Sequence, residues 1–329
     1  MRFQPRIALV ILNWNGLKDT LACLESTKKI DYPNVETIIV DNGSTDGSCA
    51  LIQERFPTAT LIQNTANLGF AEGNNIGIRY ALKNDASYIF LLNNDTVVDP
   101  QILNAFLKTF KEHPEAGILG AKIYLFDQKD TLDHLGGMWN PKSARFDLIG
   151  NRKLDTLNAF QSPQEIDYVC GAGLIAHRTV WETVGLLEAK FFLIWEESDF
   201  CFRARRAGFK TLTCPQAKIW HKVSASFVGK PHSTYFWWRN RLFWIERNCT
   251  LKEKIKIWTL QLIPDILHMI KISILKSLQL QFYYKFRPEE NCTEREQKLK
   301  KTKAALHGVK DYLLRKFGPG PAWLFQPPR

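Results

Sequence analysis

Residues 7–12, Ile-Ala-Leu-Val-Ile-Leu, form an unbroken apolar run near the start of this 329-residue chain. A short run without polar alternation is typical of a strand that is buried on both faces of a sheet. The polar turn Asn13-Trp14-Asn15-Gly16 follows, and residues 17–29 then carry leucines at helical spacing. This order of strand, turn and helix predicts the first unit of an α/β fold.

The same order recurs along the chain. Further strands are predicted at residues 35–40, 60–62 and 88–92, with helices at 50–56 and from the loop at 67–75 through residue 82. The predicted fold class is therefore α/β, a mostly parallel sheet with flanking helices. Beyond it we expect strands at 118–126 and 166–176, helices at 180–187 and 198–207, and extended segments at 211–213 and 219–221.

Polar clusters follow three of the predicted strands at their carboxyl ends. Asp41 and Asp46 follow the second strand, Asn67 follows the third and Asp95 follows the fourth. Ligands of open α/β sheets bind beyond these ends, so we expect the side chains to share one polar site. Neither the glycine-rich dinucleotide fingerprint nor the P-loop is present. A bound nucleotide diphosphate would then need a divalent cation, for which Asp95 is the natural ligand.

Three carboxylates, Glu196, Glu197 and Asp199, stand directly after the apolar and aromatic run at residues 191–195. Mutual repulsion and an apolar flank both raise the pKa of a carboxylate, which makes it a better proton acceptor near neutral pH. The alternative is the first turn of an ordinary helix, where acidic residues favour the positive end of the dipole. The stretch alone leaves both interpretations open.

Seven motifs stand in order along the chain. They are Asn13-Trp14-Asn15-Gly16, Val40-Asp41-Asn42-Gly43-Ser44-Thr45-Asp46-Gly47-Ser48, Asn67-Leu68-Gly69-Phe70-Ala71 with Asn74-Asn75, Leu91-Leu92-Asn93-Asn94-Asp95-Thr96, Gly171-Ala172-Gly173, Glu196-Glu197-Ser198-Asp199 with Cys201 and Arg203, and His221. Together they resemble glycosyltransferase family 2, in its bacterial rhamnosyltransferase-like branch. The resemblance extends over residues 7–226.

This resemblance implies a GT-A fold and an inverting transfer of a sugar from a nucleotide-diphosphate donor, such as dTDP-rhamnose or a UDP-sugar. The acceptor would be a hydroxyl of a glycan or a lipid-linked glycan in cell-surface polysaccharide synthesis. A divalent metal, Mg²⁺ or Mn²⁺, is implied on Asp95 and His221, although Asn93 stands where the metal motif usually begins with aspartate. Asp41 takes the position that recognises the nucleobase. The implied donor-binding residues are Leu12, Asn13, Trp14, Asp41, Asn67, Gly69, Asn94 and Asp95, and the implied acceptor-binding residues are Gly171, Ala172, Gly173 and Trp195.

Glu197 is our candidate for the catalytic base, at a position where relatives usually have aspartate. Asp199 is the second candidate, and Glu196 is expected to orient or pack. Arg203 follows Asp199 by four residues, so on a helix the two side chains are expected to pair. An inactive membrane-associated scaffold, or a protein that only binds sugar nucleotides, is the alternative function, because Glu197 and Asn93 both replace aspartates.

The C-terminal third holds the charge of the chain. Residues 231–329 carry 19 Lys and Arg against 8 Asp and Glu, which accounts for the whole net charge of +11. Residues 252–286 are rich in apolar residues but interrupted by charges, which favours a helix lying in a membrane interface over one that spans it. A core helix packed on the catalytic domain is the alternative, and nucleic acid is not expected as a partner. A final amphipathic helix is predicted at residues 295–317.

We therefore expect a GT-A catalytic domain at residues 1–232, with a donor half near 1–100 and an acceptor half near 101–232. A basic amphipathic helical extension at residues 233–329 would touch an anionic membrane surface. The seven cysteines are scattered, and no signal peptide is recognisable at the N-terminus. The expected location is the cytoplasm, peripheral on the inner face of the cell membrane, and the oligomeric state stays open.

Overall fold

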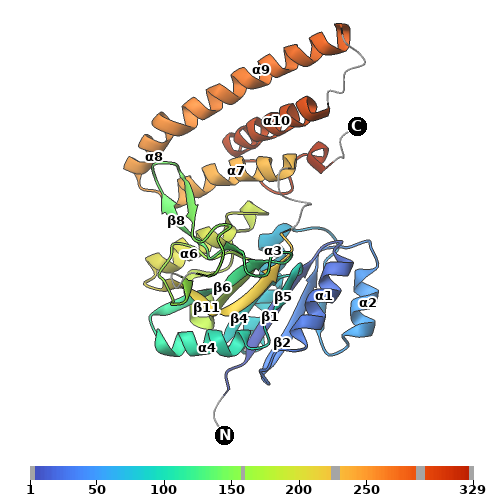
Figure 1. Ribbon diagram of the computed structural model, residues 1–329, viewed down its shortest axis with the longest axis vertical. Coiled ribbons are helices and arrows are strands. Elements are labelled where there is room, and N and C mark those ends of the chain that lie inside the picture. The colour runs from blue at the N-terminus through green and yellow to red at the C-terminus, as the bar shows by residue number, and fades with distance from the viewer. Residues whose placement is uncertain (1–3, 157–159, 224–229, 287–292, 326–329) are drawn as a thin grey trace. The chain divides into compact units, whose positions relative to one another are not determined.

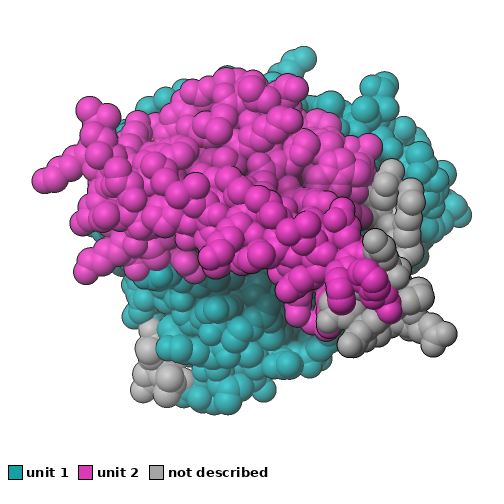
Figure 2. All heavy atoms as spheres, turned by 90° about the horizontal axis from the view of Figure 1, so that it is seen from above, with its two compact units in different colours: residues 1–139, 146–192, 196–223 teal, residues 140–145, 193–195, 224–329 magenta. Residues whose placement is uncertain are grey.

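The computed structural model describes residues 4–156, 160–223, 230–286 and 293–325 (Figure 1). The chain divides into two compact units, which Figure 2 colours separately. Unit 1 comprises residues 1–139, 146–192 and 196–223, and unit 2 comprises residues 140–145, 193–195 and 224–329. The domain boundary expected at residue 232 stays a prediction.

Unit 1 is built on one large sheet with the strand order β3-β2-β1-β4-β10-β6-β11-β5, and β7 pairs with β6 at the side. Its first four strands are all parallel, as the repeated pattern of strand, turn and helix predicts. They are β1 (Ile7–Asn13), β2 (Val35–Asp41), β3 (Thr60–Gln63) and β4 (Tyr88–Asn93). The helices between them are α1 (Leu17–Thr27), α2 (Ser48–Arg55) and α3 (Gly69–Lys83).

The second half of the sheet mixes directions. Strand β10 (Gly173–His177) runs antiparallel to both β4 and β6 (Ala116–Leu125), and β11 (Lys210–His221) runs parallel to β6. Two short strands, β5 (Thr96–Val98) and β7 (Leu132–His134), pair antiparallel with β11 and β6. Strands β8 (Gly137–Asn140) and β9 (Arg145–Leu148) form a separate two-stranded sheet. Helices α4 (Ile102–Glu112), α5 (Arg178–Val184), η2 (Ala189–Phe191) and α6 (Glu196–Arg206) complete the unit.

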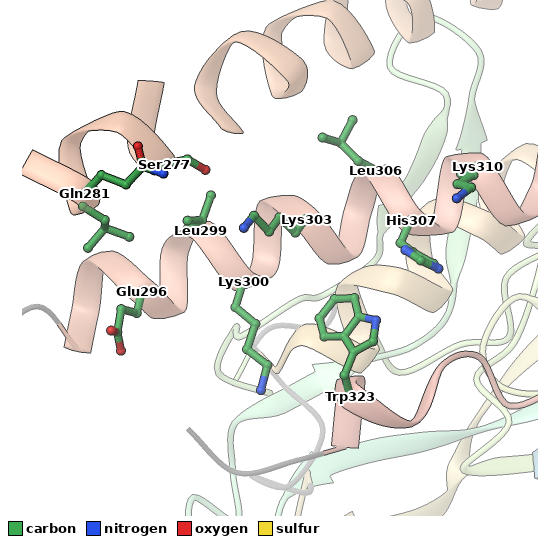
Figure 3. A pocket seen from close by; sticks show the side chains of 11 residues that line it. Ser277, Gln281, Glu296, Leu299, Lys300, Lys303, Leu306, His307, Lys310 and Trp323 are labelled. Carbon is green, nitrogen blue, oxygen red and sulfur yellow. The ribbon is translucent and has the colours of Figure 1, made fainter. Parts of the chain in front are cut away.

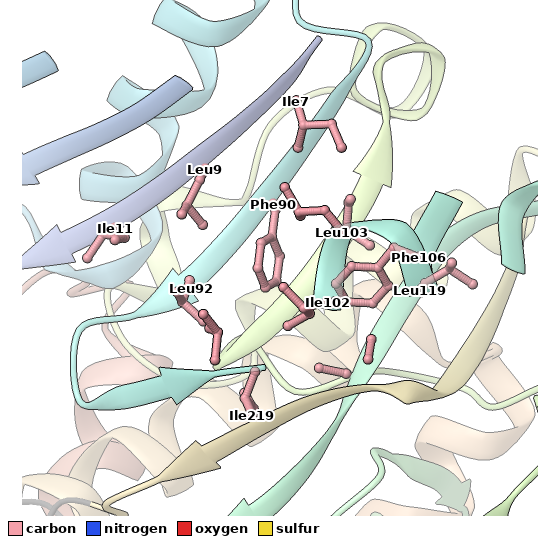
Figure 4. Packing of buried hydrophobic residues seen from close by; sticks show 14 of the residues in the cluster. Ile7, Leu9, Ile11, Phe90, Leu92, Ile102, Leu103, Phe106, Leu119 and Ile219 are labelled. Carbon is pink, nitrogen blue, oxygen red and sulfur yellow. The ribbon is translucent and has the colours of Figure 1, made fainter. Parts of the chain in front are cut away.

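Both faces of the sheet are covered, which explains why the central strands are apolar without alternation. On one face, Leu9 and Phe90 pack with Phe106 of α4 (Figure 4). On the other face, Val10 and Leu91 belong to a second buried cluster. Each fully buried Leu, Val or Phe side chain contributes about 1.5–3 kcal/mol to folding. The predicted α/β class is confirmed.

Three predictions of secondary structure are wrong in detail. The strand expected at residues 166–176 begins only at Gly173, because residues 165–168 make isolated bridges to Leu212 and Gly137 instead of a ladder. The helix expected from Ser198 begins at Glu196. The two segments expected at 211–213 and 219–221 are one strand, β11, with an irregularity between Cys214 and Lys218.

Unit 2 is helical. Its described elements are α7 (Pro231–Asn248), α8 (Leu251–Ile257), the π-helical turn η3 (Trp258–Leu262), α9 (Ile263–Phe286), α10 (Thr293–Leu313) and η4 (Ala322–Phe325). Helices α7 and α10 approach closely at Gly308, where a Cβ atom would lie 2.5 Å from the carbonyl oxygen of Tyr235. The Tyr235 hydroxyl donates a 2.7 Å hydrogen bond to Asp311 across the same contact.

One stretch of unit 2, Leu251–Phe282, is long and apolar enough to cross a membrane by length and composition alone. It is one continuous run of helical residues through α8, η3 and α9. Little of its most apolar part is buried within the protein. This stretch is therefore not a core helix of unit 2.

Candidate active site

The end of β1 and the end of β2 meet in a buried polar network. The parallel register places Asn13 opposite Asp41. The Asn13 amide donates to Asp41 over 2.7 Å and to the Ser48 hydroxyl over 2.9 Å. The Thr20 hydroxyl donates to the Asn13 carbonyl oxygen over 2.7 Å, so every polar atom of that amide group has a partner. These bonds fix the geometry of the loop that follows each strand.

Asp41 is almost wholly buried and already accepts two hydrogen bonds, from Asn13 and from the backbone N–H of Ser44 at 2.8 Å. Its carboxylate therefore ties the end of β1 to the loop that follows β2. Trp14, the next residue after β1, leaves 49% of its surface exposed beside this network. An exposed indole at this position offers a flat face on which a nucleobase can stack.

A second predicted donor loop is tied to the same edge. The Asn42 amide donates to the carbonyl oxygen of Gly69 over 3.0 Å and to Asn67 over 3.3 Å. Gly69 has φ +83°, and a Cβ atom there would lie 2.5 Å from the ring of Phe192. Only glycine fits this close approach, at which the N–H of Phe70 donates to the carbonyl oxygen of Phe192 over 2.5 Å.

Asp95 and His221 lie together, as predicted for a metal site. Strand β11 places His221 opposite Thr96, the neighbour of Asp95, and the imidazole Nε2 lies 3.1 Å from Asp95 Oδ1. On its other side, Nδ1 lies 3.7 Å from Asp133 Oδ2. Burial lowers the pKa of His221, but the nearby carboxylates of Asp133 and Asp95 outweigh it and raise the pKa to about 9. The site therefore stabilises positive charge.

The family that the motifs resemble implies a divalent cation at these residues. Within the described ranges, no group of three or more His, Cys, Asp or Glu residues has the arrangement of a complete metal site. Mg²⁺ and Mn²⁺ sites at phosphates, however, use one or two protein ligands and take the rest from phosphate oxygens and water. The buried Oδ1 of Asn93, two residues before Asp95, has no hydrogen-bond partner among the described residues. The residues fit a cation shared with a diphosphate.

Glu197 lies in the first turn of α6, which confirms the helical interpretation without removing the chemical one. Its Oε2 atom is buried and has no hydrogen-bond partner in the part of the chain that the structure describes. Burial raises the pKa of Glu197, while backbone N–H groups of Glu197 and Gly171 lower it, with a net value of about 7. A carboxylate with this pKa can accept a proton near neutral pH and release it again.

The other two acids of the cluster differ from Glu197. Asp199 is fully buried and accepts a 2.8 Å hydrogen bond from the Nε atom of Arg203, so the predicted pair is confirmed. Arg203 also donates to the backbone carbonyl oxygens of Val184 and Leu186, over 2.7 Å each. A carboxylate held in a buried ion pair is a weaker base than one without a cation beside it, so Asp199 suits the role of base less well than Glu197 does. Glu196 is buried beside Glu197 in the same turn.

The four residues predicted to bind the acceptor are not equivalent. Gly171 lies against Glu197, since a Cβ atom built there would be 3.9 Å from the Glu197 Cβ atom. Gly173 instead packs under Ile219, and the carbonyl oxygen of Ala172 accepts a hydrogen bond from the N–H of Asn93. Trp195 belongs to unit 2, where its ring lies 5.7 Å from that of Trp244. Gly171 is thus the one of these four with a described contact to Glu197.

Comparison with known proteins matches residues 5–245 to the family model described as "Glycosyltransferase like family 2". The chain belongs to this family. It is 26% identical to the N-acetylglucosaminyl-diphospho-decaprenol L-rhamnosyltransferase of Mycobacterium tuberculosis over 65% of this chain and 80% of that protein. It is 25% identical to a dTDP-rhamnosyl transferase of Shigella flexneri, over 68% of this chain and 72% of that protein.

A solved structure shares the fold of this glycosyltransferase. The mannosyltransferase of Pyrobaculum calidifontis, in complex with GDP-Man and Mn²⁺, matches 96% of this chain and 89% of its own. The TM-score is 0.57 and the sequence identity is 15%. The similarity confirms the GT-A fold that the motifs imply.

Sequence reasoning missed two polar contacts of the glycosyltransferase, one in each unit. Asp133 lies close to His221 and belongs to β7, a strand of three residues. No local sequence pattern predicts that this short strand pairs with β6. In unit 2, the buried side chain of Asn240 on α7 donates to the carbonyl oxygens of Leu193 and Ile194, over 2.7 and 2.9 Å. Ile194 and Trp195 have positive φ angles of 62° and 80°, immediately before α6 in the chain. Asn240 could have been noticed in the sequence, because it is a polar residue within a helix rich in aromatic residues.

Proposed function

We propose that this glycosyltransferase transfers a sugar, with inversion, from a nucleoside-diphosphate donor to a hydroxyl group of a glycan or lipid-linked acceptor. One observation carries the proposal most directly. Glu197 presents a buried carboxylate oxygen without a described partner, and its pKa of about 7 suits a general base. A structural carboxylate in such a place would be expected to have its hydrogen bonds satisfied.

At the donor end, Asn13 and Asp41 order the loops that face the base, and Trp14 offers a stacking surface. Asp95 and His221 would hold the divalent cation, which supplies neutralisation of the diphosphate charge when it is bound. The Mn²⁺ that accompanies GDP-Man in the mannosyltransferase structure supports Mn²⁺ or Mg²⁺ here. Asn93 and Asn94 lie beside Asp95 in sequence, and Asn94 donates to Thr20 over 2.8 Å, which links this end to the base-binding network.

In the transfer step, the acceptor hydroxyl oxygen forms a bond to the anomeric carbon as the bond from that carbon to the diphosphate oxygen breaks. The hydroxyl proton passes to Glu197, and the bonding electron pair leaves with the nucleoside diphosphate. Attack from the face opposite the leaving group inverts the anomeric configuration. General base assistance of this kind contributes about 10²–10⁴-fold to the rate.

The donor and acceptor classes are proposed from the relatives. One relative is named as a dTDP-rhamnosyl transferase, and another as acting on a diphospho-decaprenol-linked sugar. These names support dTDP-rhamnose as the donor here, with a UDP-sugar as the alternative. They also support a lipid-linked acceptor in the synthesis of a cell-envelope polysaccharide.

We further propose that residues 233–329 attach the enzyme peripherally to the inner face of the cell membrane, while residues 1–232 carry out the transfer. The stretch Leu251–Phe282 is mostly unburied, and its charge-rich surroundings carry the excess of lysine and arginine. Such a helix binds the interface through apolar burial and attraction to anionic lipids. Apolar side chains exposed along it are Leu251, Ile255, Leu260, Ile263, Leu267, Ile270, Ile274, Leu275, Leu278 and Phe282.

A donor screen tests the function. The purified chain would be incubated with Mn²⁺ or Mg²⁺ and a panel of nucleotide sugars, and release of nucleoside diphosphate would be followed. We expect metal-dependent release from one donor that is lost in Asp95→Ala and strongly reduced in Glu197→Gln. Glu112→Gln, a surface carboxylate on α4, is the matched control and should keep full activity. Absence of both turnover and metal-dependent nucleotide binding across the panel would contradict the proposal.

A further inference from the structure

A groove of about 750 Å³ lies between α9 and α10 of unit 2, with η4 at one end (Figure 3). Its apolar part begins with Leu280 of α9 and Leu299 of α10, which are both buried and form a small cluster of their own. Leu306 and Trp323 extend this apolar lining along the groove. The volume is that of a typical small-molecule site, and the lining suits a hydrocarbon chain.

The α10 side of the groove is basic. Lys300, Lys303 and Lys310 line it at helical spacing, so they rise along α10 in steps of about 4.5 and 10.5 Å. Neither Lys303 nor Lys310 forms an ion pair with a described carboxylate. Glu296 is the one carboxylate among the described lining residues. The groove thus combines an apolar floor with a net positive wall.

This combination matches a molecule with an anionic head and an apolar tail. We propose that the groove binds an anionic membrane phospholipid, with its phosphate on the lysines of α10 and part of an acyl chain against Leu280 and Leu299. The proposal rests on the membrane association proposed above and names its lipid. A helix with exposed leucines and isoleucines, α9, forms the other wall, so a lipid at the interface lies within reach of the groove.

Charge complementarity selects this occupant. Residues 231–329 carry an excess of eleven positive charges, which attract an anionic leaflet by about 1 kcal/mol per Lys or Arg near its surface, or about fivefold in affinity. A groove that only gathered lipid by diffuse charge would respond equally to the loss of any lysine. A groove that holds the phosphate would respond to Lys303 and Lys310 more than to other lysines of the same helix.

The test uses the full chain and a short-chain phosphatidylglycerol below its micelle concentration, titrated by calorimetry. We expect saturable binding that is about 25-fold weaker in the double variant Lys303→Gln with Lys310→Gln. The matched control is Lys298→Gln with Lys301→Gln, which removes the same charge from α10 outside the groove lining and should weaken binding less than about fivefold. Short-chain phosphatidylcholine should bind much more weakly than phosphatidylglycerol.

Three results would overturn the assignment. An equal loss of affinity for phosphatidylglycerol in the two double variants would mean that the lipid is attracted only by the diffuse positive charge of α10. Inorganic phosphate binding as tightly as the lipid would remove the role of the apolar floor. If farnesyl diphosphate bound more tightly than phosphatidylglycerol, and if the variant Lys303→Gln with Lys310→Gln lost this binding, the groove would be a site for lipid-linked substrates and not for membrane phospholipid.

The lipid-binding role of the groove can be refuted while the proposed transferase function stands. Donor turnover measured on the same preparations reports the transferase by itself. Co-sedimentation with vesicles of phosphatidylcholine containing phosphatidylglycerol reports membrane association. Equal vesicle binding by the groove and control variants would refute the lipid-binding groove alone. If none of the proteins bound vesicles, the membrane association would be refuted as well.

Discussion

Replacement of Glu197 by glutamine should raise the stability of the folded protein and lower its turnover, because the buried carboxylate destabilises the fold and is our candidate for the base. The pKa of Glu197 is about 7 in the folded protein because burial disfavours its charged form, against an ordinary value of 4.5. Between these two values the folded chain holds a proton that the unfolded chain has released. The protonated carboxyl therefore supports stability fully below pH 4.5, and that support is lost as the pH rises through about 7.

The size of the effect follows from the same two values. Their difference, multiplied by about 1.36 kcal/mol for each tenfold change in proton affinity, gives roughly 3 kcal/mol at full ionisation. Glutamine cannot ionise and has nearly the same shape. Glu197→Gln should therefore match the parent chain near pH 4.5 and become more stable by about 2–3 kcal/mol at about pH 8.5.

Urea-induced unfolding of the two proteins at several pH values measures this difference. Titrating groups that do not interact with Glu197 are common to both chains and cancel in the comparison, and the thiols and the phenol that Glu197 perturbs have raised pKa values. Glu112→Gln provides the control, since a half-exposed surface pair contributes about 0–1 kcal/mol and should give no comparable rise with pH. In parallel, the turnover of the parent enzyme should increase as the pH rises through about 7, and that of Glu197→Gln should be lower by about 10²–10⁴-fold.

A stability difference that stays flat from about pH 4.5 to about pH 8.5 would refute the reasoning, because it would mean that the folded protein does not perturb the carboxyl. A rise that is complete below about pH 6 would place the pKa near its ordinary value. In either case the burial of Glu197 would no longer support its assignment as the base.

Three further predictions concern neighbouring residues. Gly69→Ala should lower the free energy of unfolding by roughly 1–3 kcal/mol in urea titrations, because φ is +83° and the new Cβ would meet Phe192; an unchanged value would contradict the close approach. Asn13→Ala leaves buried partners unsatisfied, so it should destabilise by roughly 1–3 kcal/mol and weaken nucleotide binding measured by calorimetry. Asn240→Ala removes two hydrogen bonds from the loop before α6, so kcat should fall more than KM rises; a change in KM alone would speak against a positioning role.

The polar network at the ends of β1 and β2 could be predicted from sequence because its parts are local. Each parallel strand ends in a polar turn, so the register of β1 with β2 follows once both are strands, and Asn13 then meets Asp41. The hydrogen bond between them is a consequence of pattern and period. The same reasoning predicted Asp95 beyond the end of β4, and the structure ends that strand at Asn93, two residues before Asp95.

The rest could not be predicted because it depends on pairing between distant segments. His221 meets Asp95 only because β11 pairs antiparallel with β5 and parallel with β6. Asp133 joins them from a short strand that exists because β6 is there to pair with it. The break of the predicted strand at residues 166–172 has the same origin, since those residues serve bridges and the wall beside Glu197 in place of a ladder.

The two interpretations of the acidic stretch, a proton acceptor with a raised pKa and the first turn of a helix, both apply to Glu197. A helix N-terminus and the N–H of Gly171 favour the charged form of Glu197, while burial favours the neutral form. Either influence alone would move the pKa away from neutrality, downward in the first case and upward in the second. Their opposition holds the carboxyl where it can both take and release a proton at physiological pH. A carboxylate in an exposed first turn would satisfy the helix equally well, so it is the burial of the Glu197 carboxyl that makes the difference.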